Sequence, residues 1–588
     1  MTNNNAVFDG KLTANNKLIS RSFRSLMMTM MFAGVVAMAG SFIDGVVIGN
    51  VMGQQSMAAF SYASPVFLLI ASLAGIFANG GKALCSQYIG EEKYGEVRKN
   101  FTMAGITVIV LGLVITAVCM TLSTPIAMLL GARDDLVPLA ADYIFGLGIG
   151  AVPIMLMQLI TSYLCLDNAE RLCFFGAVCM TVVNIGLDLL FSMVWQGGLL
   201  GMGLATSLSY VAALLLELVY FFRKDRLLRL SHPGRCGKQL LQLTKTGLPS
   251  AVSRVCFSVA NILLNSMLFA CAGAAAVSAF SVQSTVNMFV SAIFAGVTSE
   301  ISVFAGIFYG ERNKTALKAS FLTACKYGLI LSVILGVIIF AFAPQLAGLI
   351  LKSDGQTLAI AANSLRFLSI SLPTEVLSMT LIYYYLSTDK VRLSHAGCLL
   401  HNLILVILPA LVLKQFMGIN GIWLSALMSG LLLYPTMLPL LHRYGGGSHL
   451  ERWMALPKDF IPADQRVFEV SITNEMNQVM ASIDSLRQFC QDNGVDEERT
   501  RRICLSMEEI VGNIVHHGSK KPGQVLIDIR FTTGGTDACL SVRDNGVKFN
   551  PLSYQNRSSQ YGLQMIRGIT KKMTYCYTTG MNNLNLYL

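Results

Sequence analysis

Residues 41–53 read SFIDGVVIGNVMG, an apolar stretch with one carboxylate, Asp44, in its middle. The apolar character extends over residues 25–50. An α-helix needs about 20 residues of this kind to cross the hydrocarbon core of a bilayer. We therefore expect a membrane-spanning helix here. Because a charge inside such a span is costly, Asp44 is also a candidate functional residue.

Eleven similar stretches follow, and with the first they predict an all-α polytopic membrane domain. Hydrophobic residues make up 54% of the 588 residues and only 13% are charged. That charged share is about half of what soluble proteins usually carry. The twelve expected spans are 25–50, 60–89, 100–122, 137–166, 172–194, 199–222, 243–271, 276–308, 317–343, 358–386, 394–416 and 420–442.

A short motif recurs at the same place in the two halves of this domain. The second span is followed by YIGEEKYGEVRK (88–99) and the eighth by FYGERNKTALK (308–318). Internal repeats of six spans are a common way to build a transporter, with the substrate path between the halves. We therefore expect two six-helix bundles. The expected segments are an N-terminal segment at 1–24, lobes at 25–222 and 243–443, and a loop between the lobes at 223–242.

Positive charges predict the orientation of the spans. Lysines and arginines gather in the loops after the second, sixth, eighth and tenth spans, whereas the opposite loops carry few. Cytoplasmic loops hold this excess, so we expect both termini in the cytoplasm. Much of the net charge of +11 lies in these short loops, and we therefore expect no nucleic-acid partner. The fourteen cysteines show no paired spacing that indicates disulfides or zinc.

Four stretches of the first lobe resemble a known transporter family. They are SFIDGVVIGNVMG (41–53), LCLDNAERL (164–172), NIGLDLLF (184–191) and GLLGMGLATSLS (198–209). In this order and spacing, residues 20–443 resemble the multidrug and toxic compound extrusion (MATE) family, in particular its prokaryotic branch. The resemblance implies a bacterial plasma-membrane protein that exports small cationic or amphipathic compounds, driven by inward Na+ or H+.

Asn184 and Asp188 are four residues apart, so both project from one face of the fifth span. Two carboxylates and an amide that face one cavity are suited to bind a proton or Na+. The family resemblance implies that Asp44, Asn184 and Asp188 form the cation site of the first lobe. The alternative is that Asp44 or Asp188 only bonds a neighbouring helix.

The chain changes character after His449, where charges become frequent and apolar runs become short. We interpret 444–464 as a linker and 465–588 as a soluble α/β domain with two layers. Alternation of apolar residues predicts strands, and amphipathic runs predict helices. The expected strands are 467–472, 524–531, 538–544, 573–579 and 582–588, and the expected helices are 474–493, 497–518 and 562–572.

The sequence EEIVGNIVHHG (508–518) places Glu509 and Asn513 on one face of the second of these helices. Asp544-Asn545-Gly546 then ends a strand, and Tyr561-Gly562-Leu563 opens the next helix. This order resembles the GHKL ATPase superfamily (the Bergerat fold), and most closely the anti-sigma-factor type of serine kinase.

The GHKL resemblance implies a role for each of these positions. Glu509 would be the general base or would orient the attacking hydroxyl, and Asn513 would hold the Mg2+ that bridges the phosphates of ATP. Asp544 would accept from the adenine amino group, and Gly546 would let the chain pass close to the base. Gly562 would let a helix N-terminus approach the phosphates, where free N–H groups favour anions.

The sequence departs from the GHKL pattern in three places, which puts phosphoryl transfer in doubt more than nucleotide binding. Lys548 and Gln560 stand where small residues are usual, and the lid between Asn550 and Gln560 is short.

Three hypotheses for the whole chain remain open. The first is an ion-coupled transporter whose cytoplasmic Mg-ATP domain regulates flux or acts as a serine kinase. The second is a membrane-anchored signalling kinase that senses a ligand and phosphorylates an anti-sigma-antagonist-like protein. The third is a transporter with a degenerate tail. Asp44, Asn184 and Asp188 favour the first hypothesis, because a pure sensor needs no coupling-ion site.

Overall fold

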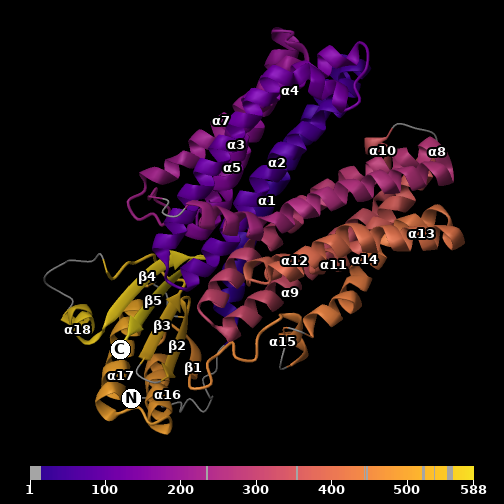
Figure 1. Cartoon of the computed structure of the whole chain (residues 1–588). Coiled ribbons are helices and arrows are strands. Elements are labelled where there is room, and N and C mark those ends of the chain that lie inside the picture. Colours follow the sequence, from indigo (N-terminus) through magenta and orange to yellow (C-terminus); the bar gives the residue numbers. More distant parts are fainter. Residues whose placement is uncertain are drawn as a thin grey trace, which may run out of the picture. The chain divides into compact units, whose positions relative to one another are not determined.

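The computed structural model describes residues 15–232, 236–351, 355–442, 444, 448–518, 523–534, 537–552 and 561–588 (Figure 1). The chain forms two compact units. One, here called the membrane unit, is Arg24–Lys458. The other, here called the C-terminal unit, combines Met1–Phe23 with Asp459–Leu588. The predicted boundary at 465 separates the soluble domain from the membrane spans but leaves out the N-terminal segment that folds with it.

The first lobe of the membrane unit consists of apolar helices interrupted by short π- and 3-10 segments. The helices are α1 (Lys17–Val47), α2 (Gly53–Gly90), α3 (Tyr94–Leu129), α4 (Leu136–Ile149), α5 (Ala151–Leu164), α6 (Glu170–Leu189) and α7 (Gly198–Leu218). The short segments are η1 (Ile48–Met52), η2 (Cys165–Asp167), η3 (Leu190–Val194) and η4 (Val219–Phe222). The fourth predicted span is therefore two helices, α4 and α5, with a bend of 51° between them.

The second lobe has the same all-helical character, and Figure 1 shows the helices of the two lobes as two groups. Its elements are α8 (Cys236–Gly310), α9 (Lys314–Ala341), α10 (Ala343–Ile350), α11 (Gly355–Ser387), α12 (Val391–Leu399), η5 (Leu400–Ile404), α13 (Leu405–Met417) and α14 (Ile419–Leu441).

The number of spans agrees with the twelve expected from the sequence. Among the described residues, ten helices are long and apolar enough to cross a membrane, and eleven if α4 and α5 count as one span. One of these, α8, is 75 residues long, far more than the roughly 20 residues that one crossing needs. Inside it, Ala272 and Gly273 have non-helical φ/ψ values. This break divides α8 into the seventh and eighth predicted spans.

The recurring sequence motif forms the same turn in both lobes. Glu92 and Arg312, each two residues after the glycine of the motif, both have positive φ values, 57° and 53°. The two glycines also lie where α2 and α8 pack closely. A Cβ on Gly90 would lie 2.0 Å from the carbonyl oxygen of Ile307, and one on Gly310 would lie 2.3 Å from that of Gln87. The repeat therefore places two glycines where the helices of the two lobes are in close contact.

Part of the predicted linker is a helix docked on the membrane unit. Ser448 caps the N-terminus of α15 (His449–Trp453) by accepting a hydrogen bond from the backbone of Glu451. The carboxylate of Glu451 bridges Lys314 and Lys318 of α9, at 2.8 and 2.6 Å. The hydroxyl of Tyr385 donates to the carbonyl of Trp453 at 2.7 Å. The linker therefore continues the second lobe up to Lys458. Within the predicted linker, residues 445–447 lie outside the described part of the chain.

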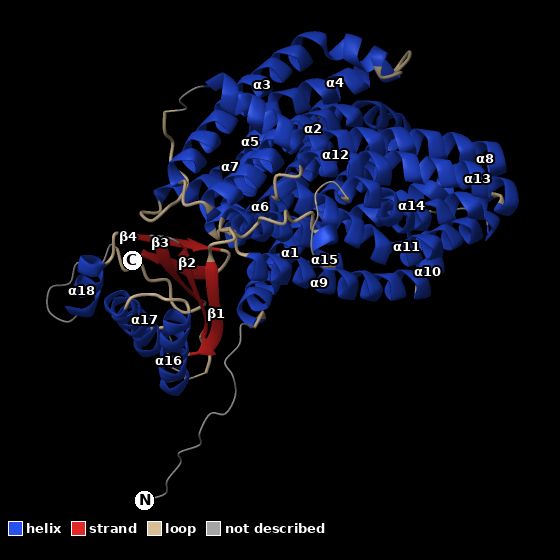
Figure 2. Ribbon diagram, turned by 60° about the horizontal axis from the view of Figure 1, so that its bottom comes forward, coloured by secondary structure: helices blue, strands red, loops and turns tan. Residues whose placement is uncertain are grey.

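The C-terminal unit is an antiparallel five-stranded sheet with helices on one face (Figure 2). The strands pair in the order β1-β2-β3-β5-β4. In chain order the elements are β1 (Arg466–Thr473), α16 (Met476–Asp492), α17 (Glu497–His517), β2 (Leu526–Gly534), β3 (Asp537–Asp544), α18 (Tyr561–Ile569), β4 (Lys572–Thr578) and β5 (Met581–Tyr587). Every predicted strand and helix of this domain is present, and the two-layer architecture is confirmed.

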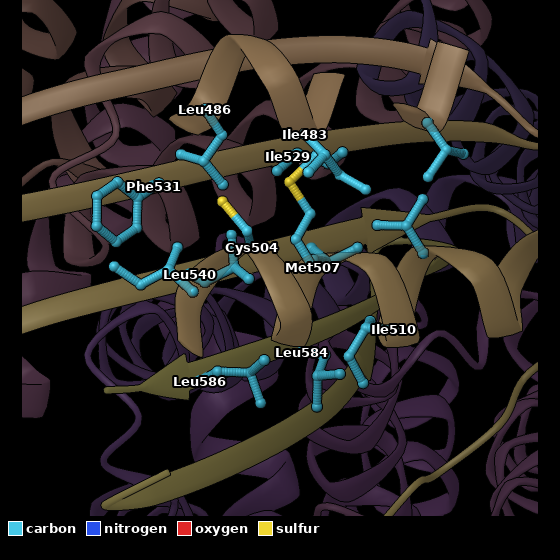
Figure 3. Packing of buried hydrophobic residues seen from close by; sticks show 14 of the residues in the cluster. Ile483, Leu486, Cys504, Met507, Ile510, Ile529, Phe531, Leu540, Leu584 and Leu586 are labelled. Atoms are coloured by element: carbon cyan, nitrogen blue, oxygen red, sulfur yellow. The ribbon is translucent and has the colours of Figure 1, made fainter. Parts of the chain in front are cut away.

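Alternation along the strands separates an apolar face from a polar face. Alternate residues of β2, such as Ile529 and Phe531, are buried and pack with Met507 and Ile510 of α17 (Figure 3). Burying side chains of this size stabilises a fold by about 2 kcal/mol each. This core fixes α17 against the sheet and so positions the polar residues on the neighbouring face of the same helix.

Candidate functional sites

The three polar residues predicted in the first lobe come together. Asp44 lies near the end of α1, and Asn184 and Asp188 lie one turn apart on α6. The amide nitrogen of Asn184 donates to Asp44 Oδ1 at 2.5 Å and to Asp188 Oδ2 at 3.0 Å. The structure therefore joins two carboxylates from different helices through one amide.

Burial makes two negative charges at this acidic site unfavourable. Asp188 is fully buried, and its Oδ1 has no hydrogen-bond partner among the described residues. The carboxyl groups of Asp44 and Asp188 both lie within hydrogen-bonding distance of the same amide nitrogen. Two carboxylates this close repel each other unless a proton or a cation lies between them. The site is therefore suited to bind one of these.

Ser209, on α7, was not anticipated and determines how the amide points. Its hydroxyl donates to Asn184 Oδ1 at 3.0 Å. Because the amide oxygen is occupied by this bond, the amide nitrogen faces the two carboxylates. Serine is common in membrane helices, so the sequence offered no signal for Ser209.

Irregular helix geometry accompanies both carboxylates. The π-helical segment η1 begins four residues after Asp44, and η3 begins two residues after Asp188. The two segments also contact each other. Single π-turns are rare in proteins and are found frequently at functional sites. The backbone therefore adjusts at the point where α1 and α6 bring their acidic residues together.

In the C-terminal unit, the predicted Mg-ATP residues of α17 meet the start of α18. The amide of Asn513 donates to Glu509 Oε1 at 2.9 Å, so the two side chains form one polar group. A Cβ on Gly562 would lie 2.0 Å from Glu509 Oε1. This glycine therefore lets the N-terminus of α18 come directly against Glu509.

Asp544 lies at the end of β3 and is 5% exposed. Its Oδ1 accepts from the backbone N–H of Gly546 at 2.7 Å and from the amide of Asn582 at 2.9 Å. Burial raises the pKa of Asp544, and these two hydrogen bonds oppose that rise. Since both bonds fall on Oδ1, Oδ2 is the oxygen that is available to an adenine amino group.

The loop after β3 passes close to the end of α17, as a nucleotide pocket of this kind requires. A Cβ on Gly546 would lie 2.9 Å from Asp544 Oδ1 and 3.1 Å from the carbonyl oxygen of Gly518. The backbone N–H of Val547 donates to that same carbonyl at 3.2 Å. Glycine therefore fits a cradle that a side chain would fill, and the residues present are compatible with a bound nucleotide.

Asn582, the second residue of β5, organises this end of the sheet and was missed by sequence reasoning. Besides Asp544, its amide donates to the carbonyl of Val547 at 3.1 Å, and its oxygen accepts from the hydroxyl of Tyr575 at 2.7 Å. The signal was weak, because Asn582 stands among three asparagines in the run NNLNLYL. Only the pairing of β5 with β3 shows which of them reaches Asp544.

One departure from the GHKL pattern has a structural explanation. The ammonium group of Lys548 lies 5.3 Å from the ring centre of Tyr577, where a cation–π contact holds it. Gln560 and most of the short lid, 553–560, lie outside the described residues.

Two parts of the chain match known protein families. Residues 29–190 and 249–411, more than half of the chain, match the MatE family. The chain belongs to the MATE family. Residues 472–588 match the histidine kinase-like ATPase domain. This MATE protein therefore carries a second, ATPase-like domain, and the first match covers Asp44, Asn184 and Asp188.

Curated relatives are similar over most of the membrane unit. The multidrug export protein MepA of Staphylococcus saprophyticus is 23% identical over 408 residues, which cover 68% of this chain and 88% of the relative. MepA of Staphylococcus aureus strain MRSA252 is 23% identical over 420 residues, which cover 69% and 90%.

Solved structures share the fold. An outward-facing multidrug resistance MATE transporter of the MOP superfamily has a TM-score of 0.67 at 23% identity, covering 73% of this chain and 97% of that one. A MOP-superfamily transporter from Pyrococcus furiosus has a TM-score of 0.66 at 23% identity, with coverages of 73% and 98%. Both covered shares fit the membrane unit of this chain.

Proposed function

We propose that this MATE protein exports small cationic or amphipathic compounds in exchange for Na+ or H+ bound at Asp44, Asn184 and Asp188. The observation that carries the proposal is that one amide joins the buried carboxylate of Asp188 to the half-buried carboxylate of Asp44. The relatives named as multidrug export proteins support the substrate class. Intramembrane carboxylates of this kind commonly mark ion and substrate pathways.

The residues of the site suggest how exchange occurs. When a proton or Na+ occupies the space between Asp44 and Asp188, the repulsion between the carboxylates is relieved and α1 and α6 are held together. When the ion leaves, the uncovered negative charge favours a cationic substrate. Asn184 stays oriented by Ser209 in both states, so only the charge of the site changes. The coupling ion and the cationic substrate compete for the same negative charge, so one leaves when the other binds, which is antiport.

We also propose that the C-terminal unit binds Mg-ATP. Asp544 Oδ2 would accept from the adenine amino group, and Asn513 would hold the Mg2+, which would supply positive charge against the phosphates. The N-terminus of α18 at Gly562 would offer free N–H groups to the phosphates. Glu509 lies beside both and is placed to orient an attacking hydroxyl. This arrangement fits regulation of flux, and also phosphorylation of a serine on an anti-sigma-antagonist-like protein.

We also propose a location for the two units, from the charges of the loops and from the family. The excess of lysine and arginine in alternate loops supports cytoplasmic termini, so the C-terminal unit would lie where ATP is available. Multi-pass insertion in the plasma membrane agrees with the MATE assignment.

Transport is tested with the full chain in proteoliposomes, with ethidium as the probe and an imposed Na+ or proton gradient. We expect Asp188→Asn to abolish gradient-driven ethidium movement and the exposed loop variant Asp135→Asn to retain it. Equal activity in both variants would contradict the proposed ion site.

Nucleotide binding is tested by calorimetric titration of the purified full chain with Mg-ATP, alongside Asn513→Ala. We expect micromolar binding that depends on Mg2+ and is lost in the variant. Transfer of labelled phosphate from ATP to an added protein would identify a kinase, whereas binding without transfer would leave the unit as a regulator. No binding to the folded chain would refute the proposal for this unit.

A further inference from the structure

The start of the first membrane helix is part of the C-terminal unit. Residues 15–23 belong to the same compact unit as Asp459–Leu588, although the whole membrane unit, Arg24–Lys458, lies between them in the sequence. The hydroxyl oxygen of Ser471, on β1, lies 2.9 Å from the backbone nitrogen of Asn15 and 3.2 Å from its carbonyl oxygen. Ser22, which is 8% exposed, donates its hydroxyl to the carbonyl of Thr579 in the turn between β4 and β5. The segment is therefore anchored at both of its ends.

The turn that Ser22 contacts belongs to the hairpin that positions the adenine-binding aspartate. Thr579 is followed by Met581 and Asn582, the first residues of β5, and Asn582 donates to Asp544. Arg21 makes a longer contact, 3.5 Å, with the carbonyl of Gln524, just before β2. The contacts of Ser22 and Arg21 therefore fall on chain that adjoins the proposed nucleotide pocket.

Beside the start of β2, one more bond leads to the pocket. The backbone N–H of Leu526 donates to the side chain of Asn545 at 2.8 Å, and Asn545 directly follows Asp544. A shift of the N-terminal segment would therefore reach the Asp544 loop along two routes, through β2 and through β5.

The same helix carries the acidic site of the membrane unit. α1 is one uninterrupted helix from Lys17 to Val47. It includes Ser22 of the C-terminal unit and, 22 residues later in the sequence, Asp44 of the membrane unit. The other covalent connection leaves the second lobe after α15, which is docked on α9 through Glu451. The C-terminal unit is thus joined to the first lobe by a helix and to the second lobe by an anchored segment.

We propose that Asn15–Phe23 is the segment through which nucleotide binding acts on α1 and thereby on the acidic site at Asp44. The inference rests on the proposed binding of Mg-ATP. Nucleotide that orders the Asp544 loop and the β4–β5 turn would stabilise the docked form of the segment. Alternating access moves the repeats of such transporters relative to each other. A ligand that favours one position of α1 would therefore change the balance between the transporter's states.

Thermodynamic linkage makes the proposal measurable, because a coupling between two sites is reciprocal. If the nucleotide pocket and the acidic site communicate through the docked segment, a change at Asp44 must alter nucleotide affinity. That effect must disappear when the docking is broken. The four proteins needed are the unmodified chain, Asp44→Asn, Ser22→Lys and the double variant. They form a double-mutant cycle, which isolates coupling from the separate structural effect of each change.

The measurement is the dissociation constant of the non-hydrolysable analogue Mg-AMP-PNP for the full chain in lipid nanodiscs. We expect Asp44→Asn to change this constant about fivefold or more, the lower end of typical allosteric coupling. In the Ser22→Lys background we expect a change of less than about twofold. Ser25→Lys serves as the matched control, because Ser25 is exposed and lies on the same helix. In the Ser25→Lys background, Asp44→Asn should change the dissociation constant as much as it does in the unmodified chain.

A second readout covers the case in which Ser22→Lys fails to fold. Hydrogen exchange of the unmodified chain should show amides of residues 17–23 and of the β4–β5 turn protected when AMP-PNP is added, and Ser22→Ala should weaken that protection. Nucleotide binding with no change in these amides would overturn the inference while leaving the proposed ATP site intact. The same holds if Asp44→Asn has the same effect in the Ser22→Lys and Ser25→Lys backgrounds. Absence of AMP-PNP binding to the unmodified chain would overturn the proposed ATP site, and this inference with it.

Discussion

Replacing Asn582 with alanine removes the side chain that holds Asp544 and should weaken nucleotide binding. The amide of Asn582 supplies one of the two hydrogen bonds on Asp544 Oδ1, at 2.9 Å, and Asp544 is 5% exposed. A hydrogen bond to a charged group contributes about 1.5–3 kcal/mol. Because about 1.4 kcal/mol corresponds to a factor of ten, we expect the dissociation constant of Mg-ATP to rise about tenfold to a hundredfold.

The same change should also shift the pH dependence of binding. Burial raises the pKa of Asp544, and the bond from Asn582 opposes that rise. Without the bond the pKa rises further, so the carboxylate takes up a proton at a higher pH than in the unmodified chain. Protonated Asp544 is a poorer acceptor for the adenine amino group. Affinity should therefore fall as the pH is lowered, and this fall should begin at a higher pH in Asn582→Ala.

The assay is calorimetric titration of the full chain with Mg-ATP at several pH values between 5 and 8. Asn583→Ala is the matched control, since Asn583 is the next residue of β5 and accepts from Arg543 rather than contacting Asp544. It should bind as the unmodified chain does. Affinity in Asn582→Ala within about twofold of the unmodified chain would refute the reasoning, and so would an equal loss in Asn583→Ala.

Three further predictions concern other parts of the molecule. Ser209→Ala should free the Asn184 amide to rotate and weaken gradient-driven ethidium transport several-fold without abolishing it, as proteoliposome assays would show. Glu451→Gln should release α15 from α9, because the carboxylate holds two lysines whose proximity lowers its pKa; limited proteolysis should then cut faster within 448–458. Burial raises the pKa of Asp528 to about 6, so its ionisation destabilises the C-terminal unit as the pH rises from about 4 to 6. Asp528→Asn should therefore stabilise this unit by up to about 3 kcal/mol at pH 7 and not at pH 4, as hydrogen exchange of β2 would measure.

Much of the fold was predictable because the bilayer imposes a length on each span. An apolar run of about 20 residues has one common explanation, and helical spacing then places Asn184 and Asp188 on one face. In the C-terminal unit, alternation along 526–531 separated the buried residues from the exposed ones. These are local properties, so the sequence carries them directly.

Contacts between distant segments were not predictable in the same way. Asn582 reaches Asp544 only because β5 pairs with β3 instead of β2, and the spacing of residues does not state the order of strands. Likewise, nothing in the polar segment 15–23 indicates that Ser22 bonds Thr579, more than 550 residues further along. The sequence thus pointed to Asn184 and Asp544 as candidates, but not to Ser209 and Asn582, which contact them.

At both sites a neutral amide, and not a cation, holds a buried carboxylate. Each has a buried carboxylate that must be held in place and yet remain available to a ligand. A lysine or arginine partner would neutralise it, and among the described residues no salt bridge involves Asp188 or Asp544. A neutral amide takes that position instead: Asn184 donates to Asp188, and Asn582 donates to Asp544.

A hydroxyl in turn fixes each of these amides, from Ser209 in the membrane unit and from Tyr575 in the C-terminal unit. An amide orients a carboxylate without cancelling its charge. In the proposed function, the negative charge is left for a coupling ion or a cationic substrate in the first site, and for the adenine amino group in the second. Replacing either asparagine with a cationic residue would fill the site with a permanent counter-ion, which is why a neutral donor suits both positions.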